Sequence, residues 1–375
     1  MNTVSRLTTF FSWRTLRAFI HRLLPVLNRA PVSKRAPEPA HEQQQGPRKV
    51  STKLGSFHVG SRDVGIGFRM LPAFSGDIVN ILFDADEDSI EQTRLAWEKH
   101  SKCETRVFPF CVAEAEGTQT LFLNFDAYTS SLYPFNADYG EFYTYHEPGK
   151  VDYVLKESVA PMERRKVKMH SLDGLLRRQE LADVAPDFLS LDTQGSEFRI
   201  LTGARQALQD HVLGLLVEVE FVPIYENQPL FHEVQSFLES AGFYFVGLDF
   251  HEEYSPFRER TGARGRGFLL SGEALFLRRW DRLTPEVADP DALYLMLHKL
   301  AFISVMFDRL EYALQVLQQA DKIAPSPQMK VKIGERVYFR FLQELREVVG
   351  AMPPAFPRTM REAMTFEEAQ SRFKS

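Results

Sequence analysis

Acidic residues stand at the ends of two apolar segments in the middle of the chain. Asp192 closes the segment 188–192, and Glu218 and Glu220 lie near the end of the segment 213–221. A carboxylate at the end of a buried strand is costly unless it pairs with a cation or binds a ligand. These three acids could bind an amine or a hydroxyl of a substrate, act as a general base, or hold a divalent metal ion. We predict Asp192 as the first candidate base, with Glu220 or Glu218 as an alternative base or as a group that orients the acceptor.

Two earlier segment ends carry residue types that suit a nucleoside. Gly60 is the last residue of the apolar segment 54–60, and Ser61 follows it. Asp84 is the last residue of the next apolar segment, 79–84. A glycine at such a bend lets the backbone approach a nucleotide, although a lone glycine more often marks only a turn. A carboxylate about 20 positions further on is placed to accept hydrogen bonds from both ribose hydroxyls. Asp84 is therefore predicted as the ribose ligand, whereas Asp86 is placed to cap the following helix.

Short apolar segments alternate with amphipathic ones from about residue 53 onward, and this alternation must position the candidate residues. Strands are predicted at residues 54–60, 79–84, 106–112, 118–125, 188–192, 213–221, 244–250 and 274–277, and helices at 65–74, 89–100, 196–208 and 231–241. The pattern predicts an α/β fold with a doubly wound, mostly parallel sheet of seven strands, ending in an antiparallel pair. Ligands of such sheets bind at the carboxyl ends of the strands. A dehydrogenase is disfavoured because the first turn lacks a Gly-x-Gly-x-x-Gly string.

The loop after Asp192 introduces one of these helices. Ser196 could cap the helix, which would leave Glu197 as a favourable acid in its first turn.

Residues 126–165 interrupt the alternation with many aromatic residues and a Pro-Gly turn. An insertion this long in a compact domain is usually a functional lid or a disordered loop, and the aromatic content favours a lid. Side chains such as Tyr128, Tyr133 and Phe135 would suit stacking on a sugar face, but they could equally form a small satellite core.

The composition excludes several classes of protein. The formal net charge of −5 argues against a nucleic-acid binder. Two cysteines, Cys103 and Cys111, cannot form a disulfide framework or a zinc site alone, and they suggest buried thiols in a reducing compartment. No apolar run approaches the roughly 18 residues of a membrane span. We therefore expect a cytoplasmic protein, with peripheral attachment at the inner face of a membrane left open.

The two ends of the chain differ from its centre. Residues 1–29 have no acid and form a basic amphipathic segment that could lie on an anionic membrane, resemble a transit peptide, or pack on the domain. Residues 30–50 have the composition of a disordered linker. Residues 285–350 are helical and include a hairpin similar to one tetratricopeptide unit, which must pack on the catalytic domain, on a partner or on a second copy. Residues 351–375 are expected to be a loosely attached tail.

The segment 188–197 has the sequence Phe-Leu-Ser-Leu-Asp-Thr-Gln-Gly-Ser-Glu, and 217–221 has the sequence Val-Glu-Val-Glu-Phe. Together with Val112-Ala113 and Ser171-Leu172-Asp173, these strings resemble the FkbM-type methyltransferases over about residues 54–280. The resemblance implies a class I methyltransferase domain, placed at residues 51–282. It also implies methyl transfer from S-adenosylmethionine, most often to a hydroxyl of a sugar, a glycan or a secondary metabolite.

The resemblance also indicates which residues would bind the donor, namely His58, Gly60, Ser61, Asp84, Ala113 and Asp192. A divalent metal stays open but is not part of the prediction. His58 stands where the family tends to carry an acid, so it could bind the cofactor or substrate or be a structural histidine. This departure supports a second hypothesis, in which the chain is a catalytically impaired scaffold module of a glycan-assembly complex.

Overall fold

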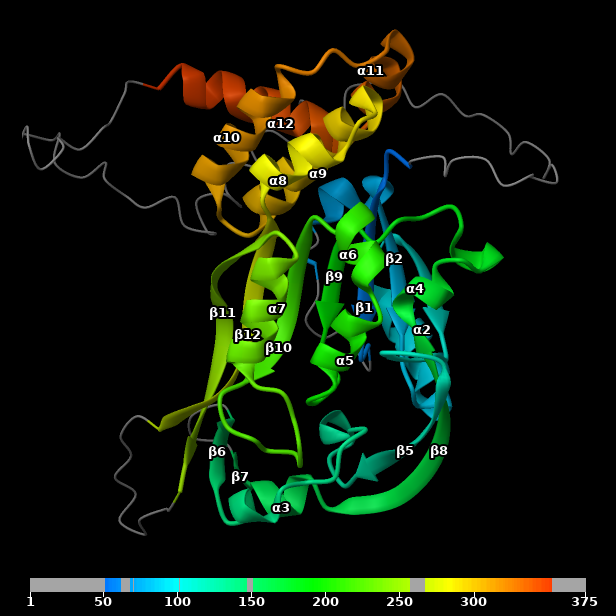
Figure 1. The fold of residues 1–375 in the computed structure, drawn as a ribbon, viewed down its shortest axis with the longest axis vertical. Helices are drawn as coiled ribbons and strands as arrows, with labels where there is room; N and C mark the ends of the chain where they lie inside the picture. The colour runs from blue at the N-terminus through cyan, green and yellow to red at the C-terminus, as the bar shows by residue number, and fades with distance from the viewer. Residues whose placement is uncertain are drawn as a thin grey trace, which may run out of the picture.

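A computed structural model describes residues 51–61, 68–69, 71–100, 102–146, 151–256 and 267–352. Among these residues, nine strands form one sheet in the order β3-β2-β1-β9-β10-β12-β11-β6-β7 (Figure 1). Its seven principal strands are β1 (Leu54–Val59), β2 (Ile78–Phe83), β3 (Glu104–Phe108), β9 (Phe188–Leu191), β10 (Gly214–Glu220), β11 (Phe243–Ser255) and β12 (Phe268–Arg278). The strands from β3 to β10 are parallel, whereas β12 is antiparallel to both β10 and β11. The predicted seven-stranded, mostly parallel sheet is confirmed.

The order of the strands reverses between β1 and β9. The chain builds outward from β1 through β2 to β3, and then returns to pair β9 with the other side of β1. All six residues of β1 and all six of β2 are buried, as expected for parallel strands with both faces covered. A ligand site is therefore expected at the carboxyl ends of β1 and β9.

Helices cover the two faces of the sheet. One face packs against α4 (Leu172–Leu175), α5 (Glu197–Thr202), α6 (Arg205–Asp210) and α7 (Phe231–Ser240). The helix α2 (Ile90–His100) follows β2 and contacts β3. The other face packs against the C-terminal helices.

Two predicted elements are divided in the structure. The strand expected at 106–112 is interrupted at Pro109, which cannot donate to a strand ladder, so β3 ends at Phe108. Its second part is β4 (Cys111–Ala113), which joins another sheet. The helix expected at 196–208 is split into α5 and α6 around Gly203, where a side chain would collide with the carbonyl of Ala113.

A second sheet has the order β4-β8-β5 and includes a strand that the sequence analysis missed. Its longer members are β5 (Gly117–Asn124) and β8 (Pro161–Ser171). Five of the eleven residues of β8 are lysine, arginine or glutamate, so the strand lacks the apolar alternation that usually reveals one.

The insertion at 126–165 is ordered where the structure describes it. It contains η3 (Ala127–Thr129), η4 (Ala137–Tyr139), α3 (Leu155–Ser158) and a hairpin of β6 (Tyr143–His146) and β7 (Val151–Val154) that extends the main sheet beyond β11. Tyr133 and Phe135 pack against a cluster that includes Ile224 and Tyr225, so these two aromatic side chains belong to a satellite core.

The C-terminal region consists of α8 (Trp280–Glu286), α9 (Pro290–Met306), α10 (Leu310–Ala320), α11 (Pro327–Gly334) and α12 (Val337–Gly350). The antiparallel pair of α9 and α10 corresponds to the predicted hairpin. Of the three expected packing partners, the catalytic domain is the one observed, because α9 shares a core with Leu54, Phe188 and Leu213 of the sheet.

Several predictions concern residues that the structure does not describe: those for 1–29 and 30–50, nearly all of the tail, and residues 65–67 and 70 of the helix at 65–74. At the end of that predicted helix the structure has a 3-10 helix, η1, which spans Pro72–Asp77. Neither cysteine is in a disulfide, and Cys111 is buried whereas Cys103 is partly buried. Within the described ranges, none of the helices combines the length and apolar character that crossing a membrane requires.

Candidate functional site

A cavity of about 1080 Å³ lies at the carboxyl ends of β1, β2, β9 and β10. The insertion and the loop after β10 form its opposite wall, to which Leu121, Tyr128, Ser131 and Tyr225 contribute. His58, Gly60, Asp84, Asp192, Glu218 and Glu220 all line this cavity. The structure thus brings six of the eight predicted site residues together.

Gly60 is the turn that joins β1 to the site. Its φ of 84° is in the left-handed region, and a Cβ built on it would lie 1.6 Å from the backbone oxygen of Asp192. Its N–H donates to Phe83 O at 3.0 Å. Only glycine fits between the ends of these strands, and the bare backbone leaves space for a ligand.

His58 and Ser61 each bury a polar atom that has no hydrogen-bond partner among the described residues. His58 is 4% exposed; its Nε2 lies 3.2 Å from Gly60 O, and its Nδ1 has no hydrogen-bond partner among the described residues. Burial lowers the pKa of His58 more than the nearby Asp192 raises it, so the ring is neutral. Ser61 Oγ is equally buried and equally without a partner there, although Ser61 does not line the cavity. Such atoms are the kind that a ligand satisfies.

Two aspartates stand at the end of β2, and both line the cavity. Asp84 Oδ1 accepts the N–H of Asp86 at 2.8 Å. Asp86 caps η2 (Glu87–Ser89) by accepting the N–H of Asp88, and it pairs with Arg165 at 2.8 Å, so its predicted role as a cap is confirmed. The ribose contact of Asp84 stays a prediction.

Ala113 lies apart from these residues. It is fully buried in β4, close to Gly203, and it does not line the cavity. Its neighbours Cys111 and Val112 do line the cavity, together with Phe110.

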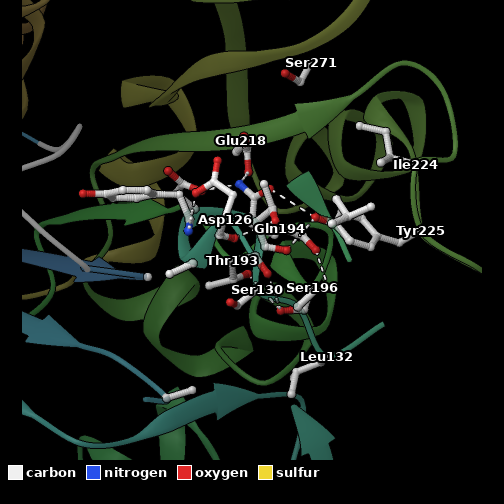
Figure 2. A pocket seen from close by; sticks show the side chains of 18 of the residues that line it. Asp126, Ser130, Leu132, Thr193, Gln194, Ser196, Glu218, Ile224, Tyr225 and Ser271 are labelled. Carbon is white, nitrogen blue, oxygen red and sulfur yellow. Dashed lines mark hydrogen bonds between the residues drawn. The ribbon is translucent and has the colours of Figure 1, made fainter. Parts of the chain in front are cut away.

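Gln194 connects the acids at the strand ends. Its Nε2 donates to Asp192 Oδ1 at 2.9 Å and to Glu218 Oε2 at 2.7 Å, while its Oε1 accepts the hydroxyl of Tyr225 at 3.3 Å (Figure 2). Its φ of 56° is unusual for a residue with a side chain and costs about 1 kcal/mol or more. Sequence reasoning missed Gln194 because a polar loop residue gives no signal of such a conformation.

Glu197 stabilises the loop rather than only the helix. Its Oε1 accepts the N–H of Thr193 at 2.6 Å, the hydroxyl of Thr193 at 2.9 Å and the N–H of Gly195 at 3.3 Å. Burial is the main cause that raises its pKa to about 7. The alternative that Ser196 caps α5 is wrong, because Ser196 makes no cap and its hydroxyl donates to Thr193 Oγ1.

Glu218 and Glu220 lie near the end of β10, and both line the cavity. Burial, followed by the nearby Asp192, raises the pKa of Glu218 well above its ordinary value. Burial and the nearby Glu197 do the same for Glu220. Both carboxyls therefore hold protons more tightly than free glutamate does.

Glu273 is a further site residue that the sequence analysis missed. It lies on β12 directly opposite Glu218 of β10, and its side chain lines the cavity. Burial raises its pKa to about 8, and Asp192 adds to the effect. The predicted strand at 274–277 began one residue too late to include it.

Hydrogen bonds join the insertion to the loop after β9 and to Tyr225, which follows β10. Ser131 Oγ donates to Gln194 O at 2.6 Å, and the Tyr225 hydroxyl donates to Thr129 O at 3.0 Å. These bonds fix the aromatic wall of the cavity relative to the acids. The described residues contain no group of three or more His, Cys, Asp or Glu side chains arranged to hold a metal ion.

The comparison with protein families identifies this arrangement. The profile of the methyltransferase FkbM domain matches residues 57–245, about half of the chain. The chain belongs to the FkbM methyltransferase family. The sheet order is consistent with a class I methyltransferase, and the matched segment carries the strand ends that line the cavity.

Other comparisons are weaker. The crystal structure of methyltransferase FkbM from Methylobacillus flagellatus KT is 12% identical, with a TM-score of 0.29. That match covers 54% of this chain and 37% of the other, so this chain spans little more than a third of that protein. No curated protein matches the chain.

Membership of the FkbM family implies S-adenosylmethionine as the methyl donor. The described residues fit this molecule: Gly60 leaves its backbone open, Asp84 presents a carboxylate for the ribose, and His58 has an unsatisfied nitrogen. The acid-lined cavity also suits a cationic sulfonium.

Proposed function

We propose that this protein is an S-adenosylmethionine-dependent O-methyltransferase whose acceptor is a hydroxyl of a sugar, a glycan or a secondary metabolite. The observation that carries the proposal is the position of Asp192, which lies against the Gly60 turn and faces the same cavity as Glu218 and Glu220. One carboxylate can thus serve the donor end and the acceptor end of the cavity.

The bound donor supplies an electrophilic methyl group on a sulfonium, and the protein has to position an acceptor in line with it. Asp192 is suited to take the proton of the acceptor hydroxyl, since the Gln194 amide fixes the orientation of its carboxylate in the cavity. Burial and the nearby Asp192 raise the pKa of Glu218, which favours a proton on Glu218 beside it. Burial of these groups excludes water from the transfer.

The test is the variant Asp192→Asn, assayed with isotopically labelled methyl donor against a panel of hydroxylated glycans and small molecules. We expect transfer to fall by about 10²–10⁴-fold, the usual contribution of a general base. The affinity for S-adenosylhomocysteine, measured by calorimetry, should remain. Asp138→Asn, an exposed change in the insertion, is the matched control and should transfer at the wild-type rate. Unchanged turnover in Asp192→Asn would remove the proposed base.

One observation supports a second function, that of a catalytically impaired scaffold module in a glycan-assembly complex. His58, with a lowered pKa, stands where the family tends to carry an acid, so β1 offers no carboxylate to the ammonium group of the donor. In that case residues 285–350 would present the surface for a partner or a second copy. Calorimetric titration with S-adenosylmethionine separates the two functions, because failure to bind at millimolar concentration favours the scaffold.

A further inference from the structure

The cavity has an unbalanced charge. Nine of the residues that line it are aspartate or glutamate, and none of the described lining residues is lysine or arginine. Buried carboxylates are normally paired with a cation or a metal. A ligand with a phosphate or carboxylate in this cavity would face only charges of its own sign, so the lining disfavours anionic acceptors.

The acids occupy two separate parts of the cavity. The donor residues stand at the ends of β1 and β2, whereas Glu252 and Glu273 belong to β11 and β12. Two strands, β9 and β10, lie between β1 and β12. At about 4.8 Å per strand, β12 is roughly 14 Å from β1. Glu273 therefore lies on the side of the cavity away from the Gly60 turn, in the acceptor half.

Glu273 and Glu218 are a cross-strand pair of carboxyl groups. They are directly opposite each other in the antiparallel register of β10 and β12, which places their Cβ atoms about 5 Å apart. Glu273 is 8% exposed, and no hydrogen bond or ion pair within the described structure joins its carboxyl to another side chain. Ionised together, the two carboxylates would repel each other and destabilise the sheet. Glu218 accepts the amide of Gln194, but no lysine or arginine is among the described residues that line the cavity.

The charged groups around Glu273 do not offset it. Asp192, Asp249 and Glu252 are negative, and Arg69, the cation near Glu273 among the described residues, forms an ion pair with Asp249. A compact cation between Glu218 and Glu273 would face both carboxylates at once.

We propose that Glu218 and Glu273 form a subsite for a primary ammonium group, so that the acceptor is a polyhydroxyl compound bearing an amine, such as an amino sugar. This inference rests on the proposed methyltransferase function, whose acceptor it narrows. An ammonium group has three donors in a small volume, which suits two facing carboxylates. Its binding favours ionised carboxyls, so Glu273, whose pKa is about 8 without ligand, releases a proton when the amine binds.

The test uses three probes that share a pyranose ring: D-glucosamine, D-glucose and D-glucuronate. Each is titrated by calorimetry into the full-length protein saturated with S-adenosylhomocysteine. We expect glucosamine to bind about tenfold or more tightly than glucose, the usual gain from charge-assisted hydrogen bonds, and glucuronate to bind least. Repeating the glucosamine titration in buffers of different ionisation enthalpy should reveal proton release.

The variant Glu273→Gln keeps the shape of the side chain and removes its charge. It should bind glucosamine and glucose alike and keep the wild-type affinity for S-adenosylhomocysteine, whereas the exposed control Glu311→Gln should keep the tenfold preference. Equal binding of the three sugars to the wild-type protein, no binding of any of them, or a preference that survives in Glu273→Gln would overturn the subsite. Failure of S-adenosylhomocysteine to bind counts against the methyltransferase function instead, and the sugar titrations then proceed without it.

Discussion

Buried acidic side chains are paired differently at the two ends of the parallel strands. At the amino ends, Asp187 accepts the N–H of Gly55 at 2.8 Å and the ammonium of Lys299 at 2.7 Å, with the side chain of Lys299 only 1% exposed. At the carboxyl ends, the Glu218–Glu273 pair and its acidic neighbours have no lysine or arginine among the described lining residues. Asp187 at the amino ends is thus paired with Lys299, whereas the carboxyl ends carry an excess of acidic side chains.

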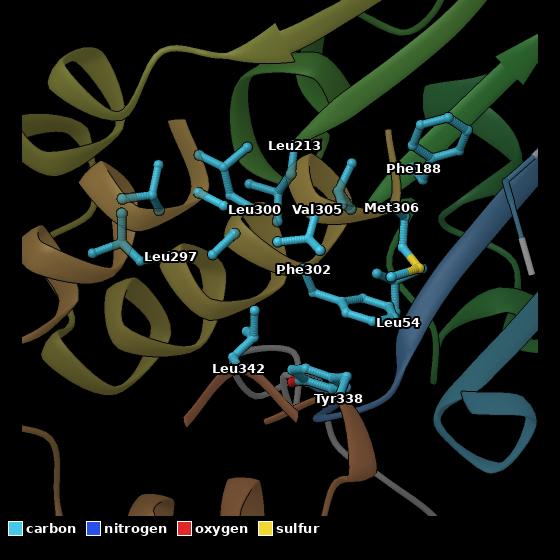
Figure 3. Close-up of a cluster of buried hydrophobic side chains, with 14 of the residues drawn as sticks. Leu54, Phe188, Leu213, Leu297, Leu300, Phe302, Val305, Met306, Tyr338 and Leu342 are labelled. Atoms are coloured by element: carbon cyan, nitrogen blue, oxygen red, sulfur yellow. The ribbon is translucent and has the colours of Figure 1, made fainter. Parts of the chain in front are cut away.

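The covering elements differ in the same way. At the amino ends, α9 and α12 pack on the sheet through an apolar core that contains Leu297, Leu300 and Phe302, and Phe302 lies beside Leu54 (Figure 3). At the carboxyl ends, the insertion encloses a cavity lined by acidic side chains and is held by hydrogen bonds and a small satellite core. The difference suits the first end to stability, whereas the buried acids at the second end cost stability.

The largest effect is expected at the amino ends. Lys299→Met leaves Asp187 buried without its cation, so the free energy of unfolding should fall by about 3–5 kcal/mol. Urea denaturation measures this loss. Lys322→Met, an exposed change, should cost less than about 0.5 kcal/mol. The comparison fails if Lys299→Met is as mild as this control, and the double variant with Asp187→Asn should recover part of the loss.

The next effect concerns the turn that joins the two strands at the site. In Gly60→Ala the new methyl group collides with the Asp192 carbonyl in a left-handed backbone, which should cost about 2 kcal/mol or more and abolish binding of S-adenosylhomocysteine. Gly76→Ala is the matched control, because a Cβ there meets nothing within 4 Å. Calorimetry and thermal unfolding of the two variants test the prediction, and normal donor affinity in Gly60→Ala would contradict it.

The acidic side chains at the carboxyl ends of the strands should also make the free energy of unfolding depend on pH. Folding raises the pKa of Glu273 from 4.5 to about 8, so the folded chain binds this proton more tightly than the unfolded chain. The free energy of unfolding should therefore fall as pH rises through this interval, and the penalty is complete above about pH 8. Glu273→Gln should flatten the slope and stabilise the ligand-free protein by about 1 kcal/mol at pH 8. Thermal unfolding between about pH 5 and pH 8 measures both, and an unchanged slope would argue against an uncompensated Glu273.

The smallest effect is expected for the hydrogen bond that holds the insertion. Ser131→Ala removes the donor to Gln194 O and should cost about 1 kcal/mol, with acceptor kcat/KM reduced by several-fold and donor affinity unchanged. Ser240→Ala, exposed at the end of α7, should leave kcat/KM at its wild-type value. If both variants behave alike, the insertion does not depend on this bond.

Much of the fold was predictable because the apolar segments of the sequence report directly on buried parallel strands. Asp192, Glu218 and Glu220 could be placed at one edge from strand ends alone, since parallel strands align their carboxyl ends. Glu273 could not, because its partner depends on an antiparallel register that one sequence does not contain.

Other features were hidden for different physical reasons. Lys299 occurs in a helix where a lysine usually faces solvent, and its partner is 112 positions away in the sequence. The strand β8 exposes its charged residues on one face and buries only Val167 and Met169, so its apolar signal is weak. The conformation of Gln194 depends on Tyr225, Glu218 and Asp192 together, which local propensity does not report.

The family match covers a shorter part of the chain than the sheet and the apolar core that packs on it. The family match ends at residue 245, yet β12 lies between β10 and β11, and α9 covers the apolar face of the sheet from residues 290–306. Gene fusion or truncation at the family boundary would therefore leave a sheet with a missing strand and an exposed core. A fragment that ends near residue 245 is expected to be insoluble, because the C-terminal helices share an apolar core with the sheet.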